Sequence, residues 1–290
     1  MHPTRRRRPA ARERVRLLRP RLFAAFATAL ALLACSTVQT TKPGVIGVDR
    51  EQRMSSLVSS DELEKGAKTA YAQVLQEAQK KGVLNRDKAQ LARVRRIAER
   101  IIPEVDAFRA DALRWDWQVN LIESDQLNAW AMPGGKIAFY SGIIDKLKLT
   151  DEEIAAIMGH EIAHALREHS RERASEQAVV NLATTGAAIA GAIFIGIDPR
   201  ATSQATQLVY QTTFGLPHSR QHETEADRIG VELAARAGYD PRAAIRVWQK
   251  MAKATGGRSG PEFLSTHPSP QTRIKDLQVY SRKVMPLYRS

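Results

Sequence analysis

Two histidines and a glutamate between positions 160 and 164 form the pattern H-E-x-x-H. If this stretch is an α-helix, His160 and His164 lie one above the other, because residues four apart share a helix face. Their imidazoles could then bind one zinc ion, while Glu161 holds a carboxylate beside a water that the metal activates. The residue types and their spacing therefore predict a zinc site that activates water.

The residues around this motif argue against the alternative, a solvated helix face with two unrelated histidines. Polar groups in a protein core need partners, so a buried helix that carries this motif requires a reason for it. Most of the neighbouring residues are apolar and lie on most sides of the expected helix, which predicts burial. These neighbours are Ile154, Ala155, Ile157, Met158, Ile162, Ala163 and Leu166.

The helix that carries the motif is predicted over residues 150–171. Thr150 can act as its N-cap, and Glu153, three residues later, completes a capping box. Asp151 and Glu152 suit the positive end of the helix dipole. The sequence therefore marks the start of this helix clearly.

A catalytic zinc usually has three protein ligands and a water, so we expect a third ligand from another helix. The segment E-T-E-A-D provides Glu223, and Asp227 follows four residues later on the same helix face. Asp227 could accept a hydrogen bond from a ligand imidazole and fix its tautomer. Glu225 lies two residues from Glu223 and should point elsewhere.

The remaining histidines near these motifs give weaker signals. His169 lies five residues after His164, so on a continuous helix it faces about 140° away and is expected at the surface. His222 adjoins Glu223 and should point away from the site. His218 could line the cleft, although a surface position is favoured.

Alternating apolar and polar residues predict a small sheet before the motif helix. Residues 114–124 and 136–140 are typical of strands, and a turn at 133–135 precedes the second one. In zinc peptidases an edge strand beside the metal helix can pair with an extended substrate backbone, although a plain hairpin that packs the core is an equally open interpretation. The candidates for this edge are residues 136–140, or Asn128, Ala129, Trp130 and Ala131.

Apolar residues at helical spacing predict further helices on both sides of the motif. Together with the small sheet they predict an α+β, mainly α fold, with one folded domain over residues 61–290. The predicted helices cover residues 61–81, 88–102, 218–236, 242–254 and 269–283.

Residues 179–197 form the most apolar stretch after the N-terminal region. Their length is near that of a transmembrane helix, but Asn181, two threonines and three glycines make this stretch a poor span. We therefore favour a buried or partly membrane-contacting helical hairpin.

Residues 1–34 are typical of a secretion signal, which is removed and does not contribute to the fold. An arginine-rich region precedes an apolar run that ends at Cys35, the only cysteine in the chain. Leu32 and Ala34, three residues and one residue before Cys35, resemble a bacterial lipoprotein cleavage site. We expect lipidation of Cys35, with residues 35–60 as a tether or irregular segment. An ordinary signal peptide, or an uncleaved anchor with an incidental cysteine, is the alternative.

The residue after Cys35 bears on localisation. It is Ser36, and by resemblance to other lipoproteins the absence of aspartate at this position favours the outer membrane. We therefore expect a lipid-anchored protein that faces the periplasm.

The net charge of +13 does not indicate nucleic-acid binding. Residues 1–34 contribute +8 of this charge, and the remaining +5 is spread along the rest of the chain. No basic stripe with interleaved aromatic residues is present, so nucleic acid is not an expected partner.

Four motifs, and their order along the chain, resemble those of the family-48 zinc metallopeptidases. They are H-E-x-x-H at 160–164, S-R-x-x-E-x-E-A-D-R-x-G at 219–230, N-A-x-x-x-P-G-G-x-I at 128–137 and S-T-H-P at 265–268. The resemblance covers residues 63–277 and implies a zincin-type fold with one zinc ion per subunit. It implies zinc ligation by His160, His164 and Glu223, with Glu161 as general base and Asp227 as the partner of a ligand imidazole.

The resemblance also concerns the C-terminal part of the chain. In some members of the family the histidine of S-T-H-P approaches the metal, so His267 is expected as a regulatory ligand or an oxyanion stabiliser. Arg273 is a second candidate for the oxyanion. The chain looks most like the compact periplasmic lipoproteins of the family.

The expected function is zinc-dependent cleavage of misfolded or unassembled envelope and outer-membrane proteins. The expected partners are such substrates, the membrane through lipid on Cys35, and either the outer-membrane assembly machinery or a second copy of the chain. The alternative is a zinc-containing chaperone or scaffold for outer-membrane protein assembly, with little proteolysis. Glu161 favours the enzyme, because a scaffold does not need a general base.

Overall fold

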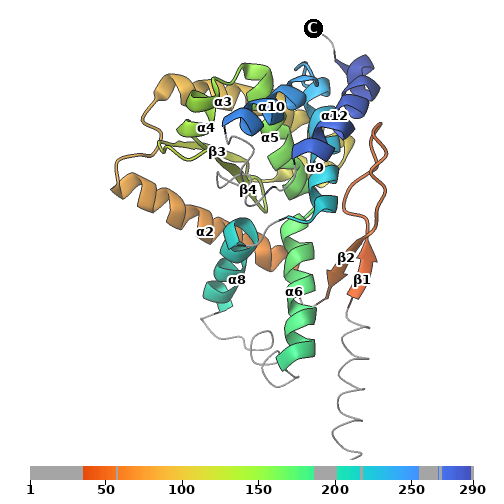
Figure 1. Ribbon diagram of the computed structural model, residues 1–290. Coiled ribbons are helices and arrows are strands. Elements are labelled where there is room, and N and C mark those ends of the chain that lie inside the picture. The colour runs from red at the N-terminus through yellow and green to blue at the C-terminus, as the bar shows by residue number, and fades with distance from the viewer. Residues whose placement is uncertain are drawn as a thin grey trace, which may run out of the picture.

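The computed structural model describes residues 35–56, 58–185, 201–215, 218–254, 267 and 270–288. This part of the chain is mainly helical, with one three-stranded and one two-stranded sheet (Figure 1). The predicted class, α+β and mainly α with a small sheet beside the motif helix, is confirmed. The predicted signal segment, residues 1–34, lies outside the described residues.

The described elements are the following. The helices are α2 (Ser60–Lys80), α3 (Lys88–Ile101), α4 (Ser141–Leu147), α5 (Asp151–Leu166), α6 (His169–Thr185), α8 (Ala201–Tyr210), α9 (Arg220–Arg236), α10 (Ala243–Ala254) and α12 (Pro270–Val284). The strands are β1 (Cys35–Val38), β2 (Gln52–Ser55), β3 (Gln118–Ile122), β4 (Ala129–Met132) and β5 (Lys136–Tyr140). Short 3-10 helices are η1 (Ile102–Ala107), η2 (Ala110–Arg114) and η4 (Met285–Leu287), and η3 (Gln211–Gly215) is a π-helix.

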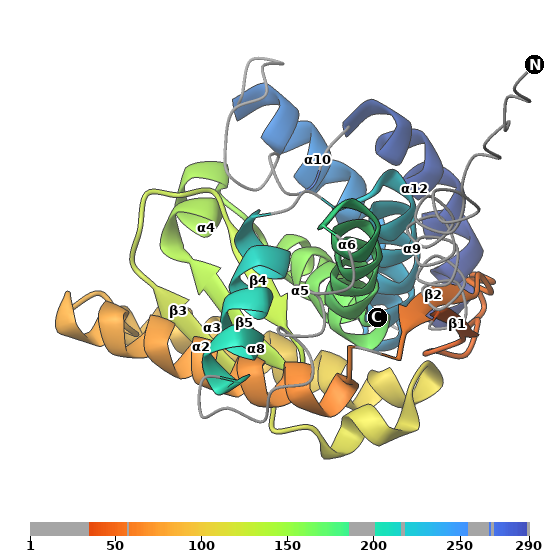
Figure 2. The ribbon, with the colours of Figure 1, turned by 90° about the horizontal axis from the view of Figure 1, so that it is seen from below.

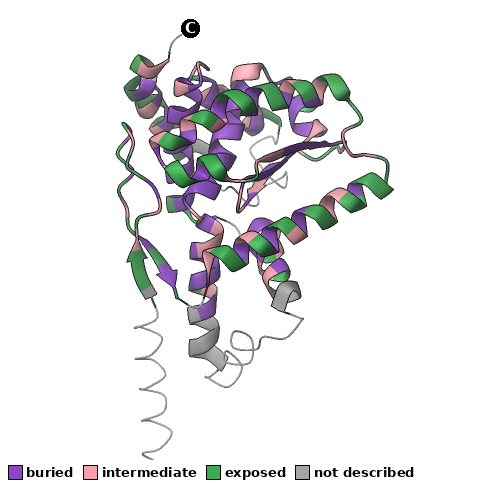
Figure 3. Cartoon of the chain, turned by 180° about the vertical axis from the view of Figure 1, so that it is seen from behind, coloured by how far each residue is buried: buried purple, intermediate pink, exposed green. Residues whose placement is uncertain are grey.

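Helix α5 carries the motif and lies at the centre of the fold (Figures 1 and 2). It begins with the predicted capping box, in which Thr150 N donates to Glu153 Oε2 at 2.8 Å and Glu153 N donates to Thr150 Oγ1 at 3.4 Å. Helices α3, α9 and α10 and strand β4 pack around it. Every residue from 153 to 166 is buried (Figure 3), which excludes a solvated face for the motif.

The helix predicted over residues 150–171 is interrupted, and the structure corrects this prediction. Helix α5 ends at Leu166, Glu168 has a φ of 48°, and α6 begins at His169. A residue in the left-handed region cannot continue a right-handed helix, so the chain changes direction here. The orientation of His169 therefore does not follow from a continuous helix.

The three-stranded sheet has the order β3-β5-β4, with β3 parallel and β4 antiparallel to β5. Helix α2 covers one face, where Tyr71 Oη donates to Ile137 O at 2.6 Å. Alternate strand residues pack with α3 and α5 on the other face. Within the described residues β4 is an edge strand, and it lies beside α5.

Residues 35–56 fold against the rest of the chain, where the sequence predicted a tether or irregular segment. Strands β1 and β2 form an antiparallel pair, and β2 packs along α6 (Figure 1). Gln52 and Met54 are completely buried. Each strand has only four residues, which is too short for alternation to be recognised in the sequence.

No helix in the described ranges is both long enough and apolar enough to cross a membrane. Of the apolar stretch 179–197, residues 179–185 continue α6. The rest of the predicted helical hairpin, residues 186–197, lies outside the described part of the chain.

Candidate metal centre

The predicted ligands converge at one buried point between α5, α9 and His267. His160, His164, Glu223 and His267 each offer a ligand atom, and these atoms lie within 4.8 Å of one another. All four residues are buried. The structure therefore brings together residues that are up to 107 positions apart in the sequence.

The spacing of these atoms fits a metal ion. Ligand atoms about 2.0–2.1 Å from a tetrahedral zinc lie about 3.3 Å from one another. His164 Nε2 is 3.1 Å from His160 Nε2 and 3.4 Å from Glu223 Oε1. His160 Nε2 is 3.6 Å from Glu223 Oε2. Two imidazoles and a carboxylate at these separations form a donor set suited to zinc.

Local structure explains how each helix contributes its ligand. The two histidines of α5 share one face because they are one turn apart. Glu223 lies in the first turn of α9, whose N-cap Ser219 accepts a hydrogen bond from His222 N at 3.1 Å. Burial lowers the pKa of His164 well below its usual value, so its ring is neutral, as metal binding requires.

Asp227 holds His160 from the side away from the other ligands. Its Oδ1 is 3.1 Å from His160 Nδ1, so that nitrogen can donate while Nε2 faces the other ligands. Burial acts to raise the pKa of Asp227, but Arg273 and His160 outweigh burial and the pKa is lowered. The structure thus places Asp227 where the sequence predicted the partner of a ligand imidazole.

Arg273 joins the two carboxylates of α9. Its Nε and Nη2 each donate to Asp227 at 2.6 Å, and its Nη1 lies 2.5 Å from Glu223 Oε2. The guanidinium also stacks over the Trp248 ring, 3.7 Å from its centroid. The sequence suggested Arg273 for the oxyanion, but here its charge is already engaged by two carboxylates.

Glu161 presents a carboxylate beside this cluster. Its Oε1 is buried and has no hydrogen-bond partner within the described structure. Burial raises the pKa of Glu161 above its usual value, although His267, His160 and a backbone hydrogen bond from Ala131 oppose this. A buried carboxylate with a free oxygen and an increased affinity for protons is suited to take a proton from water.

His267 lies within the cluster and not at its margin. Its Nδ1 is 2.9 Å from Glu223 Oε1 and 3.3 Å from His160 Nε2. Its Nε2 is 3.7 Å from Glu161 Oε1. His267 therefore contacts two of the predicted ligands and the predicted base.

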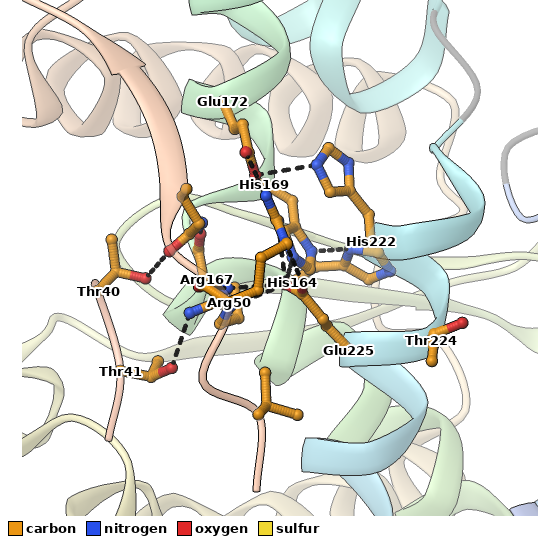
Figure 4. A network of polar contacts seen from close by, with 12 residues as sticks. Thr40, Thr41, Arg50, His164, Arg167, His169, Glu172, His222, Thr224 and Glu225 are labelled. Carbon is orange, nitrogen blue, oxygen red and sulfur yellow. Dashed lines mark hydrogen bonds and ion pairs between the residues drawn. The ribbon is translucent and has the colours of Figure 1, made fainter. Parts of the chain in front are cut away.

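Three further histidines lie buried at or beside the site. The surface position expected for His169 and favoured for His218 was wrong, although His218 does line the pocket, and His222 points toward Glu172, away from the ligands, as predicted. His169 Nδ1 is 2.8 Å from His164 Nδ1, and its Nε2 is 3.2 Å from Glu225 Oε2 (Figure 4). His222 stacks on His169 with ring centroids 4.3 Å apart. His218 stacks on His267 at 4.9 Å.

The error at His169 has a physical cause. The helical projection assumed that α5 continues through His169, whereas the turn at Glu168 directs His169 back toward His164. Glu225 points away from the ligand cluster, as expected, and binds His169 and two arginines. Only the clustering of five histidines between positions 160 and 222 with acidic residues nearby could have indicated this network from sequence.

Comparison with known proteins is consistent with this geometry. The model of Peptidase family M48 matches residues 88–281, which is more than half of the chain. The chain belongs to peptidase family M48. This confirms the family predicted from the four motifs.

The M48 relatives include mitochondrial and bacterial enzymes. The mitochondrial metalloendopeptidase OMA1 of Saccharomyces cerevisiae is 32% identical over 191 residues, which cover 64% of this chain and 52% of the yeast protein. OMA1 of Bos taurus is 37% identical over 175 residues, covering 56% and 32%. The Beta-barrel assembly-enhancing protease of Escherichia coli is 30% identical over 183 residues, covering 61% and 37%. The chain thus spans about half the length of the yeast relative and less of the others, and the predicted enzyme class, metalloendopeptidase, is the class of these relatives.

A pocket of this M48 peptidase opens beside the ligand cluster. Asn128, Ala129, Trp130 and Ala131 of the predicted substrate edge line it together with Glu161 and His164. Asn128 O accepts a hydrogen bond from Tyr140 N at 3.1 Å. Because such bonds alternate along an antiparallel pair, the backbone groups of Ala129 and Ala131 point to the open edge of the sheet.

Arg173 of α6 also lines this M48 pocket. It is 5% exposed, its Nη2 donates to Thr212 O, and its Nε and Nη1 have no hydrogen-bond partner in the described residues. Burial lowers the pKa of Arg173 to about 10, and Glu223, Glu176 and Glu161 act in the opposite direction. The guanidinium therefore carries a positive charge at neutral pH, with donors available to a molecule in the pocket. Sequence reasoning did not identify it.

Proposed function

We propose that this chain is a zinc-dependent endopeptidase that cleaves misfolded or unassembled proteins of the cell envelope, including outer-membrane proteins. The observation that carries the proposal is the buried convergence of His160, His164 and Glu223 beside Glu161, whose Oε1 accepts no hydrogen bond from the described residues. One zinc ion per subunit fits this donor set. Membership of family M48 supports the same chemistry.

In this proposal, a zinc ion held at this site would supply Lewis acidity toward the scissile carbonyl and would lower the pKa of the attacking water. His160, His164 and Glu223 hold the ion, and Asp227 keeps His160 in the orientation that presents Nε2. Glu161 takes the proton from the attacking water and passes it to the amine of the leaving segment. His267, which lies between Glu161 and Glu223, either donates to the carbonyl oxygen as it becomes negative or occupies a ligand position until substrate arrives.

Substrate would bind as an added strand on the open edge of β4. Backbone pairing reads no side chains directly, so it suits an enzyme that accepts many unfolded segments. The backbone groups of Ala129 and the carbonyl of Ala131, whose N–H already donates to Glu161, would pair with the substrate. Arg173 would hold a carbonyl or carboxylate oxygen of the substrate in the pocket. Unfolded proteins meet this requirement because their backbone is accessible.

We further propose a periplasmic location with lipid on Cys35, most consistent with the outer membrane. The lipoprotein-like segment before Cys35 and Ser36 after it support this proposal. The similarity to the Beta-barrel assembly-enhancing protease of Escherichia coli supports substrates or partners in outer-membrane assembly. The alternative partner is a second copy of the chain.

The test compares the full chain, purified in detergent, with its Glu161→Gln variant. The proposal expects about one equivalent of zinc in both proteins, and cleavage of casein or a misfolded outer-membrane barrel by the wild type alone. Glu152→Gln, a change at a half-buried position in the first turn of the same helix, is the matched control and should cleave normally. Full activity of Glu161→Gln would contradict the proposal.

The same preparation tests the chaperone or scaffold alternative. If wild type and Glu161→Gln suppress aggregation of a barrel protein equally and neither cleaves it, the alternative replaces the enzyme.

A further inference from the structure

A chain of hydrogen bonds leads from the metal ligand His164 to the N-terminal segment (Figure 4). His164 Nε2 faces the other ligands, so its Nδ1 carries the hydrogen and donates to His169 Nδ1 at 2.8 Å. His169 must then be protonated on Nε2, which donates to Glu225 Oε2 at 3.2 Å. Each ring thereby fixes the tautomer and rotation of the next.

Two arginines from different parts of the chain hold Glu225, which is 5% exposed. Arg167, at the end of α5, donates from Nε to Glu225 Oε2 at 3.0 Å. Arg50, just before β2, donates from Nη2 to Oε2 at 3.1 Å and from Nε to Oε1. The carboxylate that orients His169 thus depends on a cation that the N-terminal segment supplies.

Arg50 also reaches His169 by a second route. Its Nη1 and Nη2 bind the two oxygens of Glu172 at 2.6 and 2.8 Å, in a bidentate pair. Glu172 Oε2 accepts a hydrogen bond from His222 Nε2 at 3.0 Å. The His222 ring stacks on His169 with an interplanar angle of 17°. Arg50 therefore restrains His169 both through the edge of its ring and across its face.

The same segment is bound to the end of α5. Arg167 Nη2 donates to Arg50 O at 2.8 Å, Arg167 Nη1 donates to Thr41 Oγ1 at 3.2 Å, and Gln52 Nε2 donates to Arg167 O. Glu172 and Glu225 are buried carboxylates, and without Arg50 one of their main counter-charges is lost. Residues 35–56 consequently close the network instead of lying passively on α6.

We propose that Arg50 is a positioning residue for the metal ligand His164, acting through Glu225 and His169, so that docking of residues 35–56 strengthens zinc binding. This inference rests on the proposed function to the extent that zinc occupies the site. Coupling between two sites is reciprocal, so zinc also strengthens the docking of the N-terminal segment. A segment expected to continue from the lipid-bearing Cys35 is thereby connected to the metal centre.

The experiment measures the zinc dissociation constant of the full chain in detergent by competition with a chromophoric chelator. Arg50→Gln should weaken zinc binding by about 10–100-fold, the range found when partners of metal ligands are removed. Arg50→Lys should restore part of this loss, because a lysine keeps the charge but not the bidentate geometry. Arg53→Gln, which alters an exposed side chain of β2, is the matched control and should bind zinc as the wild type does.

A double-mutant cycle separates positioning from general destabilisation. Because Arg50 acts in part through Glu225, the pair Arg50→Gln/Glu225→Gln should lose less zinc affinity than the two single losses added together. The ¹⁵N signals of the metal-free protein should show His164 protonated on Nδ1 in the wild type and as a mixture of tautomers in Arg50→Gln. Wild-type zinc affinity in Arg50→Gln, or fully additive effects of the two changes, would overturn the inference.

The outcomes also separate this inference from the proposed function. A wild-type chain that binds zinc but cleaves no protein contradicts the proposed function alone. A chain that cleaves, and whose Arg50→Gln variant keeps full zinc affinity, contradicts the inference alone.

Discussion

Gly159 of α5 and Gly230 of α9 lie in backbone contact where the two helices cross. A Cβ atom added to Gly159 would lie 2.6 Å from Gly230 O, and one added to Gly230 would lie 2.7 Å from His160 N. Both distances are shorter than real Cβ contacts, so only glycine permits this approach. The contact is adjacent to His160, and it brings the α9 carboxylates Glu223 and Asp227 within reach of the α5 imidazoles.

Gly159→Ala should therefore weaken both the fold and the metal site. The added methyl group meets backbone atoms that cannot rotate away, and overpacking of this kind destabilises by about 1–3 kcal/mol. We expect a lower free energy of unfolding and a larger zinc dissociation constant, measured by denaturant unfolding and chelator competition. Gly215→Ala is the control, because no atom lies within 4 Å of a Cβ at that position. Equal zinc affinity in Gly159→Ala and wild type would show that the close approach does not set the ligand geometry.

Asp227→Asn should lower zinc affinity by about 10–100-fold, as expected for the partner of a ligand imidazole. The amide removes one negative charge next to Arg273 and weakens the acceptor for His160 Nδ1. Asp276→Asn is a matched control, since Asp276 also pairs with an arginine of α9, Arg228, but away from the ligands. The measurement is chelator competition, and the prediction fails if both variants bind zinc alike.

Arg173→Gln should lower kcat/KM for peptide cleavage by about 10–100-fold, which corresponds to the loss of one hydrogen bond from a charged group. The reason is that its Nε and Nη1 are donors in the pocket and have no hydrogen-bond partner in the described part of the chain. Zinc content should be unchanged, because Arg173 contacts none of the predicted ligands by a hydrogen bond within the described structure. Arg220→Gln, at an exposed position on α9, removes the same charge outside the pocket and serves as control. Unaltered kcat/KM in Arg173→Gln would remove it from substrate binding.

The stability of the chain should fall in acid because of Glu172. Burial acts to raise the pKa of Glu172, but hydrogen bonds from Arg50, His222 and the Arg53 backbone outweigh burial and hold the pKa far below its usual 4.5. A lowered pKa in the folded state stabilises the fold above pH 4.5, and this contribution is lost progressively as the pH falls below that value.

The measurement is the free energy of unfolding of metal-free protein between neutral and acidic pH. Glu172→Gln should be less stable than wild type at neutral pH and should lose less stability on acidification. Glu77→Gln, at an exposed position on α2, should follow the wild-type profile. Parallel profiles for wild type and Glu172→Gln would contradict the assignment.

Much of the fold could be predicted because its signals are local. The capping box of Thr150 and Glu153 and the apolar residues of α5 depend on neighbours within one helical turn. Strand β5 was predicted with its observed ends, since its boundaries are marked by a glycine turn and by alternation. The break at Glu168 and the pairing of β1 with β2 were missed, because left-handed turns and four-residue strands leave little pattern.

The sequence by itself determined that His160, Glu161 and His164 share a helix and can act together, because spacing within a helix follows from its covalent and hydrogen-bond geometry. Distances between elements depend on packing that no local pattern records. Only the tertiary structure therefore decided that Glu223 and His267 meet these histidines, that Arg173 faces the pocket, and that Arg50 reaches His164 through Glu225 and His169. Each of these relationships joins segments that are distant in the sequence, and each exists because buried polar groups must find partners wherever the packing of the core places them.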